Sequence, residues 1–472
     1  MSADNIFTAR EKRIVIIACC VSAFIAPLAA SMINVAIPTI GAQFGVSAHD
    51  CGWLVSAYFL SSVAFLVPMS RLSDLYGKRK LFIYGLMIVL FSSLMSGFST
   101  SFMMLMSWRL LTGLGTACVA STSISIIAQV FPKAHRGMPL AVNTMCIYIG
   151  ATIGPGLGGL ITQTLGWEWI FIFIIPFCVA GLVSMAYFKK DFRTAQGEPF
   201  DYKGSLLYGA GIVILMYGVS NLPDKIALMC VAAGIVTLIG FYNFETREKY
   251  PVLAVKLFKG RTFRRSCIAA FLNYGAAYAI IFTLSIYLQQ ICGLSPGEAG
   301  LIILIQPAVQ SVITPFSGRL SDRINPRILT TAGMMSMCVS TGLMISLTVD
   351  LSLIKVVAIL MFSGTGYALF STPNTNVIMG NVSERNYSDA SGMVSVMRQI
   401  GMMVSLATVM CMISVFMGTA SEIDPASFGL FITVIRYTFA ICFAMAFVGM
   451  FMTWFSHTES FKTAETAGPG KK

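Results

Sequence analysis

Among the residues that could do chemistry, Arg109 stands apart, because it lies inside the long apolar run of residues 105–129. A charged arginine in a membrane-crossing segment costs roughly 2.5 to 3.5 kcal/mol, so its guanidinium should face protein or a water-filled cavity rather than lipid. Two interpretations fit. Arg109 is a functional cation that meets a charged ligand, or it donates to backbone carbonyls and pins two helices together.

The twenty acidic residues are placed differently, since none lies deep in an apolar run. A buried carboxylate is the usual proton carrier in a membrane protein. Proton chemistry would therefore need a group at the rim of a run, such as Asp50 or Glu298, or Asp74 in a basic link. The three histidines lie in links or the tail, and no cysteine pair has metal-ligand spacing. We expect no catalytic residue, no metal site and no cofactor.

The elements that must position Arg109 are apolar segments of membrane-crossing length. Hydrophobic residues make up 56% of the chain and charged residues 11%, against roughly 25% charged in an ordinary soluble domain. Segments of about 20 apolar residues, enough to cross a hydrocarbon core of about 30 Å, lie near 14–38, 51–70, 80–97, 105–129, 138–161, 169–188, 204–221, 225–243, 267–291, 298–318, 328–348, 352–379, 391–416 and 430–455. The sequence predicts an all-α membrane protein with fourteen transmembrane helices.

An internal repeat divides these helices. The tetrapeptide RLSD at 71–74 returns at 319–322, each time between an apolar segment and a short basic link. Duplicated bundles are the usual build of secondary transporters. We expect a six-helix bundle over 1–190, an inserted helix pair with a central cytoplasmic link over 191–265, a second six-helix bundle over 266–456, and a cytoplasmic tail over 457–472.

The basic residues predict the topology. Of the 32 lysines and arginines, 27 fall in links on one side of the predicted spans, and Lys225 and Lys355 fall on the other. By the positive-inside rule both termini are cytoplasmic. The formal charge of +12 is spread over short links rather than gathered in one stripe, so we expect a lipid bilayer and no nucleic acid around this chain.

Three motifs resemble those of the major facilitator superfamily, and specifically its fourteen-helix drug:proton antiporter branch, over residues 13–455. The first is SRLSDLYGKRK at 70–80, which departs from the family pattern at Ser70 and Leu75. The resemblance implies a latch between helices whose charge contacts change as the central cavity switches sides. Its residues here would be Asp74, Gly77 and Arg79, with Asp322 and Arg323 in the second copy. The alternative is that these cations merely set the topology.

The second motif, Arg109 to Gly115, is similar to the signature of the fourth helix of that family. The third lies on the fifth span and looks like the antiporter signature of exporters; its residues are Gly150, Gly154, Pro155, Gly158 and Gly159. Glycines every four residues make a groove that a neighbouring helix can approach closely, and Pro155 permits a bend. We expect a packed pivot between the two halves, and the signature favours export.

One position departs from the branch: Ala29 stands where an acidic residue is usual on the first helix. The roles of proton carrier and of partner for a cationic drug are therefore open. Uncharged polar and aromatic residues are plentiful in the spans, and the candidates for the substrate cavity are Asn34, Tyr274 and Gln306, with Arg398 as a further cation inside a span.

The leading hypothesis is a secondary active transporter of the cytoplasmic membrane. It would export lipophilic, drug-like small molecules by alternating access as a monomer, coupled to protons, with Arg109, Asp50 and Glu298 as transport or coupling candidates. Uptake of an organic anion or metabolite is the nearest alternative. A membrane-embedded sensor or enzyme is a remote one.

Overall fold

The computed structural model describes residues 7–131, 137–193, 197–222, 224–253, 255–321, 324–382, 387–418 and 427–455. Across these ranges the secondary structure is helical, without strands, and fourteen helices are long and apolar enough to cross a membrane. The predicted fold class is confirmed. The first bundle holds α1 (Ala9–Phe44), α2 (Ala48–Tyr76), α3 (Lys78–Gly97), α4 (Phe102–Val130), α5 (Gly137–Thr164), α6 (Glu168–Ile172) and α7 (Ile175–Tyr187).

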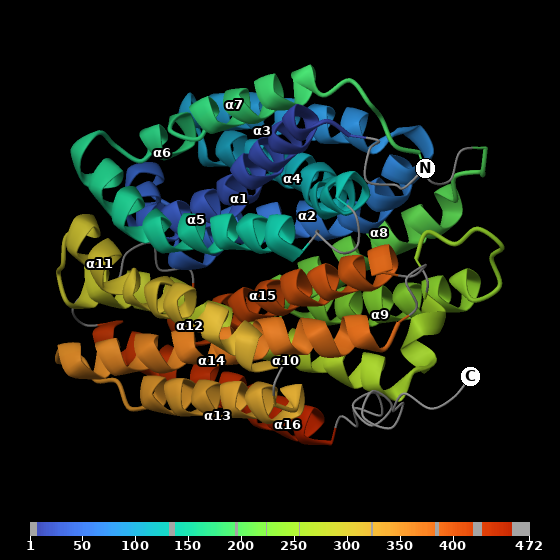
Figure 1. The fold of residues 1–472 in the computed structure, drawn as a ribbon. Helices are drawn as coiled ribbons and strands as arrows, with labels where there is room; N and C mark the ends of the chain where they lie inside the picture. The colour runs from blue at the N-terminus through green and yellow to red at the C-terminus, as the bar shows by residue number, and fades with distance from the viewer. Residues whose placement is uncertain are drawn as a thin grey trace.

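The second bundle repeats the pairings of the first. It holds α10 (Arg261–Ile286), the π-helix η4 (Tyr287–Ile291), α11 (Pro296–Ile303), α12 (Ile305–Ser321), α13 (Pro326–Ile345), α14 (Leu353–Gly380), α15 (Tyr387–Met417) and α16 (Phe428–Trp454). Helices α1 and α5 pack together as α10 and α15 do, and α2 with α4 as α12 with α14. Figure 1 shows the two bundles one above the other, with their helices running in the same general direction. The sequence repeat therefore corresponds to a structural one.

The inserted pair, α8 (Tyr202–Ser220) and α9 (Lys225–Glu245), packs mainly against itself. Helix α8 also contacts α2 of the first bundle and α15 of the second, so the pair lies beside the boundary between the bundles. The phenol of Tyr208 on α8 donates to the backbone carbonyl of Val63 on α2 at 3.0 Å. We call the boundary between the two bundles the seam.

Two predicted spans are broken into two helices each, and prolines explain both breaks. Helix α6 ends at Ile172 and α11 at Ile303, each four residues before a proline, Pro176 and Pro307. A proline has no N–H for the carbonyl four residues earlier, and its ring crowds that carbonyl. Helix α5 instead continues through Pro155.

Helix ends extend beyond the apolar runs, because capping rather than hydropathy sets them. Helix α1 begins after Thr8, which forms a reciprocal capping box with Glu11, and ends at Gly45 with φ of 61°. Helix α10 begins at Arg261, so the predicted boundary at residue 265 falls within the first turns of this helix. The basic turn of α10 lies outside the apolar run that the sequence marks.

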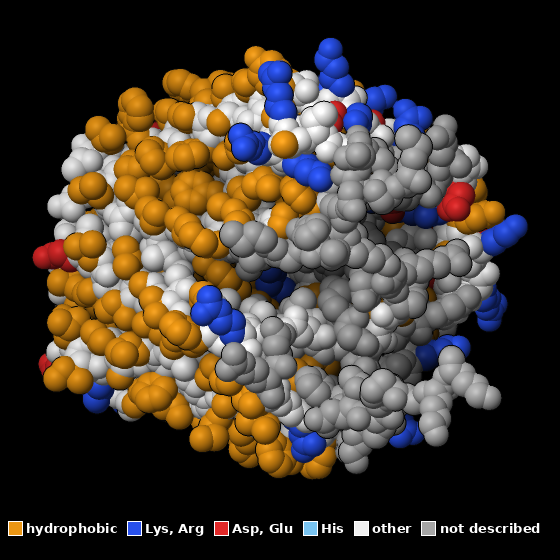
Figure 2. All heavy atoms as spheres, in the orientation of Figure 1, with side chains coloured by type: hydrophobic (Ala, Val, Ile, Leu, Met, Phe, Trp, Pro, Cys, Tyr) orange, Lys and Arg blue, Asp and Glu red, His pale blue; other side chains and the backbone are white. Residues whose placement is uncertain are grey.

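The start of α1 and the end of α16 lie at the same end of the molecule (Figure 1). We call this the basic end, because the links that join α2 to α3 and α7 to α8 carry lysine and arginine there; the opposite end is the far end. In Figure 2 lysine and arginine side chains gather toward the basic end, and hydrophobic side chains cover much of the remaining face. The face is hollowed near its middle, and a basic side chain is visible in the hollow.

Candidate functional site

The seam is held by polar contacts between α1 and α10. Asn34 Nδ2 donates to the hydroxyl of Tyr278 at 3.4 Å, and Ser285 Oγ donates to the Asn34 carbonyl at 2.8 Å. Nearer the far end, Gln289 Nε2 donates to the Val35 carbonyl at 3.1 Å. Asn34 Oδ1 has no hydrogen-bond partner although the residue is 2% exposed. This sequence candidate thus lies on the seam with an unused acceptor.

At the far end the bundles meet backbone to backbone. A methyl group built on Gly159 of α5 would clash with the carbonyl of Pro296 at the start of α11, and one on Gly300 of α11 would clash with the carbonyl of Pro155. Close approach of two helices through small residues is the purpose such glycines serve in membranes. These contacts, together with those of α1 and α10, close the seam from its middle to the far end.

The remaining glycines of the signature face another helix. A methyl group on Gly150, Gly154 or Gly158 would clash with α1, in the case of Gly158 at 2.6 Å from Met32 Cα. Helix α1 belongs to the same bundle. The expected pivot between the halves is therefore wrong for these three glycines, and Pro155 and Gly159 are the members of the signature that lie on the seam. Sequence periodicity identified a packed face but could not say which helix covers it.

Arg109 on α4 is 1% exposed and is held by α2. Its Nε donates to the Leu54 carbonyl at 3.3 Å, and its guanidinium carbon lies 4.7 Å from the centroid of the Tyr58 ring. Its Nη2 has no hydrogen-bond partner, and no carboxylate of the described residues forms an ion pair with it. The carbonyl contact pins α4 to α2, and the unpartnered Nη2 retains a charged donor. Both interpretations of Arg109 find support.

Arg398 on α15 is half-buried and lies one turn before Gly401, where an added methyl group would be 3.2 Å from Tyr274 Cβ on α10. Its charge acts on the hydroxyls of Tyr58, Tyr148 and Tyr367, which belong to α2, α5 and α14. Within the described part of the chain it makes no hydrogen bond or ion pair. It therefore lies between the bundles, reached by both.

We call five tyrosines the tyrosine cluster: Tyr58, Tyr148, Tyr274, Tyr278 and Tyr367. The charge of Arg398 acts on three of them, Tyr274 packs against Tyr367, and Tyr278 is linked to Tyr58 through Phe59. The rings of Tyr274 and Tyr367 are 5.3 Å apart, and the hydroxyl of Tyr274 is 3.1 Å from Ser371 Oγ. Across the seam, Tyr278 meets Phe59 edge-on at 5.2 Å. The candidate Tyr274 belongs to this cluster. Gln306 is 2% exposed, and its Oε1 has no partner.

The first copy of the proposed latch is closed within its own bundle. Lys78 Nζ lies 3.1 Å from Asp74 Oδ1 and donates to Ser125 Oγ on α4 at 3.1 Å. Arg79 donates through Nε and Nη2 to carbonyls in the last turn of α7, at 3.3 and 3.4 Å. These contacts join α2, α3, α4 and α7. The second copy, Asp322 and Arg323, lies outside the described residues.

Asp191 completes this loop, and the sequence did not single it out. Gly77 has φ of 118°, and the backbone N–H of Arg79 donates to Asp191 Oδ1 at 2.9 Å. A methyl group on Gly77 would clash with that carboxylate. The glycine of the motif is thus explained by both its conformation and its neighbour. Asp191 follows two lysines in the link after α7, and nothing in that pattern distinguishes it from a solvated acid.

Three more acids that the sequence did not single out organise the inserted pair. Glu198 pairs with Arg71 at 2.5 Å, so the link before α8 is tied to the end of α2. Glu245 at the end of α9 is fully buried, and the backbone N–H of Val252 donates to it at 3.4 Å. Asp201 caps α8 by accepting from the Gly204 N–H at 2.8 Å. Glu198 lies in the link before α8, whereas Asp201 and Glu245 lie at helix ends, and of the three only Glu245 is fully buried.

The two acids expected at the rims of spans, Asp50 and Glu298, lie in the first turns of α2 and α11 at the far end. Each accepts a hydrogen bond from the serine that caps its helix. Ser47 donates to Asp50 Oδ2 at 2.7 Å at the start of α2. Glu298 forms a capping box with Ser295 at the start of α11, with distances of 2.8 to 3.3 Å. Both side chains are exposed. A role in coupling would have to be compatible with this capping.

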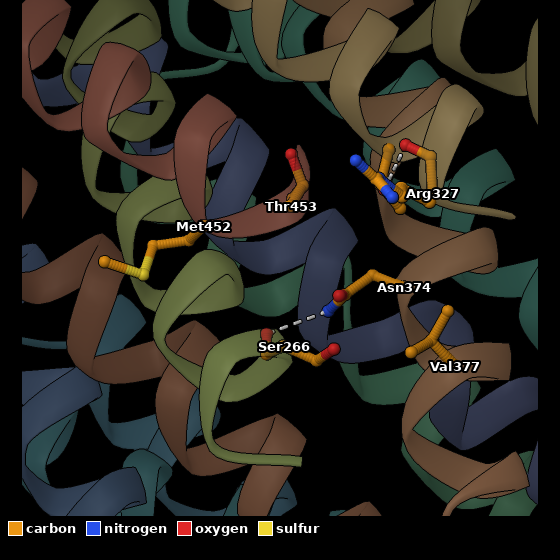
Figure 3. Close-up of a pocket in the computed structure, with 7 residues that line it drawn as sticks. Ser266, Arg327, Asn374, Val377, Met452 and Thr453 are labelled. Carbon is orange, nitrogen blue, oxygen red and sulfur yellow. Dashed lines mark hydrogen bonds between the residues drawn. The ribbon is translucent and has the colours of Figure 1, made fainter. Parts of the chain in front are cut away.

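A small pocket near the basic end of the second bundle holds about 10 Å³, which is room for one water. Figure 3 shows Asn374 reaching toward Ser266, whose carbonyl accepts from Asn374 Nδ2 at 3.2 Å. Arg327, from the second basic link, lies at this pocket with its guanidinium 4.5 Å from the Trp454 ring centroid. Its size excludes it as a substrate site.

Comparison with known proteins decides the family. The pattern of the Major Facilitator Superfamily matches residues 19–406 and 266–472. The chain belongs to the Major Facilitator Superfamily. It is a multi-pass membrane transporter of small molecules and not an enzyme.

Two relatives of this chain are named for different roles. The chain is 27% identical to the riboflavin transporter RibZ of Clostridioides difficile (strain 630), over 84% of this chain and 87% of the relative. It is 28% identical to the multidrug resistance protein Stp of Mycobacterium tuberculosis (strain CDC 1551 / Oshkosh), over 88% and 78%. The fold matches a bacterial homologue of the human lysosomal transporter Spinster, with a TM-score of 0.69, 16% identity and coverage of 95% and 98%.

Proposed function

We propose that this transporter exports lipophilic small molecules through the cytoplasmic membrane by alternating access, with the basic end in the cytoplasm. The observation that carries the proposal is the backbone contact of Pro155 and Gly159 with α11. Two members of the exporter-like signature supply a backbone-to-backbone approach of the two bundles at the far end. Opening that end requires these helices to separate, which makes the joint a natural place for a switch between two states.

A fourteen-helix antiporter coupled to protons is the specific form that we propose. It is supported by the two helices inserted between the bundles and by likeness to a protein named for multidrug resistance. No carboxylate of the described residues pairs with Arg109 or Arg398 inside the spans. The proton would have to use a group at a rim or in a link, such as Asp50, Glu298 or Asp74. The protein is proposed to work as a monomer.

Flux in vesicles tests both direction and coupling. The purified protein is reconstituted, a pH or sodium gradient is imposed, and lipophilic dyes and organic anions are screened. We expect transport out of the compartment that faces the basic end, driven by a proton gradient. Movement of an organic anion only toward that compartment would instead establish uptake, which the unpaired arginines also permit. Flux that follows sodium and ignores pH would contradict proton coupling.

A further inference from the structure

We propose that the substrate is an aromatic organic anion, and that its acid group binds Arg398 while its ring lies among the tyrosine cluster. This rests on the proposed function only in taking the space between the bundles as the substrate path. It adds the charge of the substrate, the residue that recognises it and the side chains that receive its ring.

The charge of Arg398 has no counter-charge among the described residues. Arg398 lies within the membrane-crossing part of α15, where a cation without a counter-charge is costly. The described residues provide neither a carboxylate nor a hydrogen bond for it. It remains half-buried, so protein does not fully enclose it. A ligand acid would supply the missing counter-charge, and the planar guanidinium fork matches a carboxylate or sulfonate in two parallel hydrogen bonds.

The electrostatic surroundings of Arg398 are positive, because Arg109 shares a neighbour with it. Tyr58 is acted on by both Arg398 and Arg109, so the two cations share one neighbour. Arg109 keeps an unpartnered Nη2, and the cluster hydroxyls are donors as well as acceptors. A second cation brought to about 4 Å from either arginine would be repelled by its charge. An anion would be attracted.

The rings of the tyrosine cluster and of Phe59 are arranged in a way that suits an aromatic ligand. The Tyr274 and Tyr367 rings lie 5.3 Å apart at an angle of 51°, and Tyr278 and Phe59 form an edge-on pair. Rings in these arrangements favour a further aromatic ring over an aliphatic chain, because offset and edge-on contacts add to area burial. The lining comes from both bundles, so a ligand there contacts both halves at once.

A binding experiment in detergent, without any gradient, tests the charge rule. Three probes share one naphthalene ring: naphthalene-2-sulfonate, the neutral naphthalene-2-sulfonamide and a trimethylammonium derivative. We expect the sulfonate to bind and the other two to bind at least about 10-fold more weakly. Equal affinity for the three probes would overturn the proposal, because the acid group would then not contribute to binding. Displacement of the sulfonate by an equal concentration of inorganic sulfate would also overturn it, because the aromatic ring would then not contribute.

Variants then place the acid group. Arg398→Gln should weaken sulfonate binding about 10- to 100-fold and leave the sulfonamide unchanged, and Arg398→Lys should restore part of the loss. Arg436→Gln is the matched control, because Arg436 is an exposed arginine within the span of α16. Thermal unfolding in detergent checks that each variant is folded. Unchanged sulfonate binding in a folded Arg398→Gln protein would refute the assignment.

The outcomes for binding and flux are separable. Selective binding of the sulfonate without export would contradict the proposed function and leave the anion site standing. Gradient-driven export of the trimethylammonium probe, with no binding of the sulfonate, would support export and overturn the anion site.

Discussion

At the scale of single residues, the sequence predicts that Arg109 and Arg398 are cations inside spans but does not predict their partners. A cation inside an apolar run is visible in the sequence, and the structure gives each a distinct setting. Arg109 is pinned by the Leu54 carbonyl and the Tyr58 ring, whereas the charge of Arg398 acts on phenols and has no hydrogen bond or ion pair among the described residues. The partners come from helices far apart in sequence, so no local pattern could have named them.

Arg109→Ala should abolish transport, because the change removes the charge beside Tyr58 and the link between α4 and α2. Arg109→Lys should restore it only in part, since lysine lacks the planar fork that donates to a carbonyl while lying over a ring. Flux in vesicles measures both, with Arg436→Ala as the control for loss of an exposed arginine. Wild-type flux in the alanine variant would make Arg109 a structural residue.

Gly77→Ala should destabilise the protein more than Gly197→Ala. Both glycines have positive φ, 118° and 88°, and strain of this kind costs about 1–3 kcal/mol. A methyl group on Gly77 also meets the Asp191 carboxylate, whereas one on Gly197 meets nothing within 4 Å. The difference between the two unfolding midpoints isolates the clash. Equal midpoints would show that the loop moves aside without cost.

At the scale of elements, run length predicted the existence of every spanning helix, but not their ends or their partners. Ends depend on caps such as Thr8 and Gly45, and the breaks at Ile172 and Ile303 depend on prolines four residues later. The glycine face of α5 was predicted as a packing face, and its covering helix was not. Which helix covers a face depends on the packing of the whole bundle, so the sequence of one helix does not specify its partner.

Gly158→Leu should force α5 away from α1 and stop flux, while the protein still inserts in the membrane. The new side chain would meet the backbone of Met32, 2.6 Å from its Cα, and overpacking of this kind typically costs about 1–3 kcal/mol. Gly240→Leu on α9 is the control, because no atom lies within 4 Å of its added methyl group. Normal flux in the Gly158 variant would show that close packing of α5 against α1 is not needed for transport.

At the scale of the whole molecule, the duplicated bundles and the basic links were readable from the sequence because they rest on composition and repetition. The seam was not, since it consists of contacts between residues such as Asn34 and Tyr278, far apart in the chain. The structure also refines how the topology is tested. Lys78 is 3% exposed and paired with Asp74, so a cysteine there would be a poor reporter.

Single cysteines at Arg193 and Arg261 in a cysteine-free variant should react with a membrane-impermeant reagent only from the cytoplasm, and one at Lys225 only from outside. All three residues are exposed in the structure, and the expected sides follow from the positive-inside rule. Labelling is measured in intact cells and in inverted vesicles. Reaction at Arg261 from outside would mean that the inserted pair crosses the membrane differently.

The far-end joint between α5 and α11 is built from main chain, at Gly159 with Pro296 and at Gly300 with Pro155. The tyrosine cluster is instead built from side chains, and all of its members except Tyr148 lie on other helices. Substitutions that alter which compounds fit can therefore accumulate in the cluster without touching the joint, whereas almost any change at the joint meets a carbonyl group. In evolutionary terms this arrangement lets ligand preference diverge among descendants of one gene while the moving part stays the same.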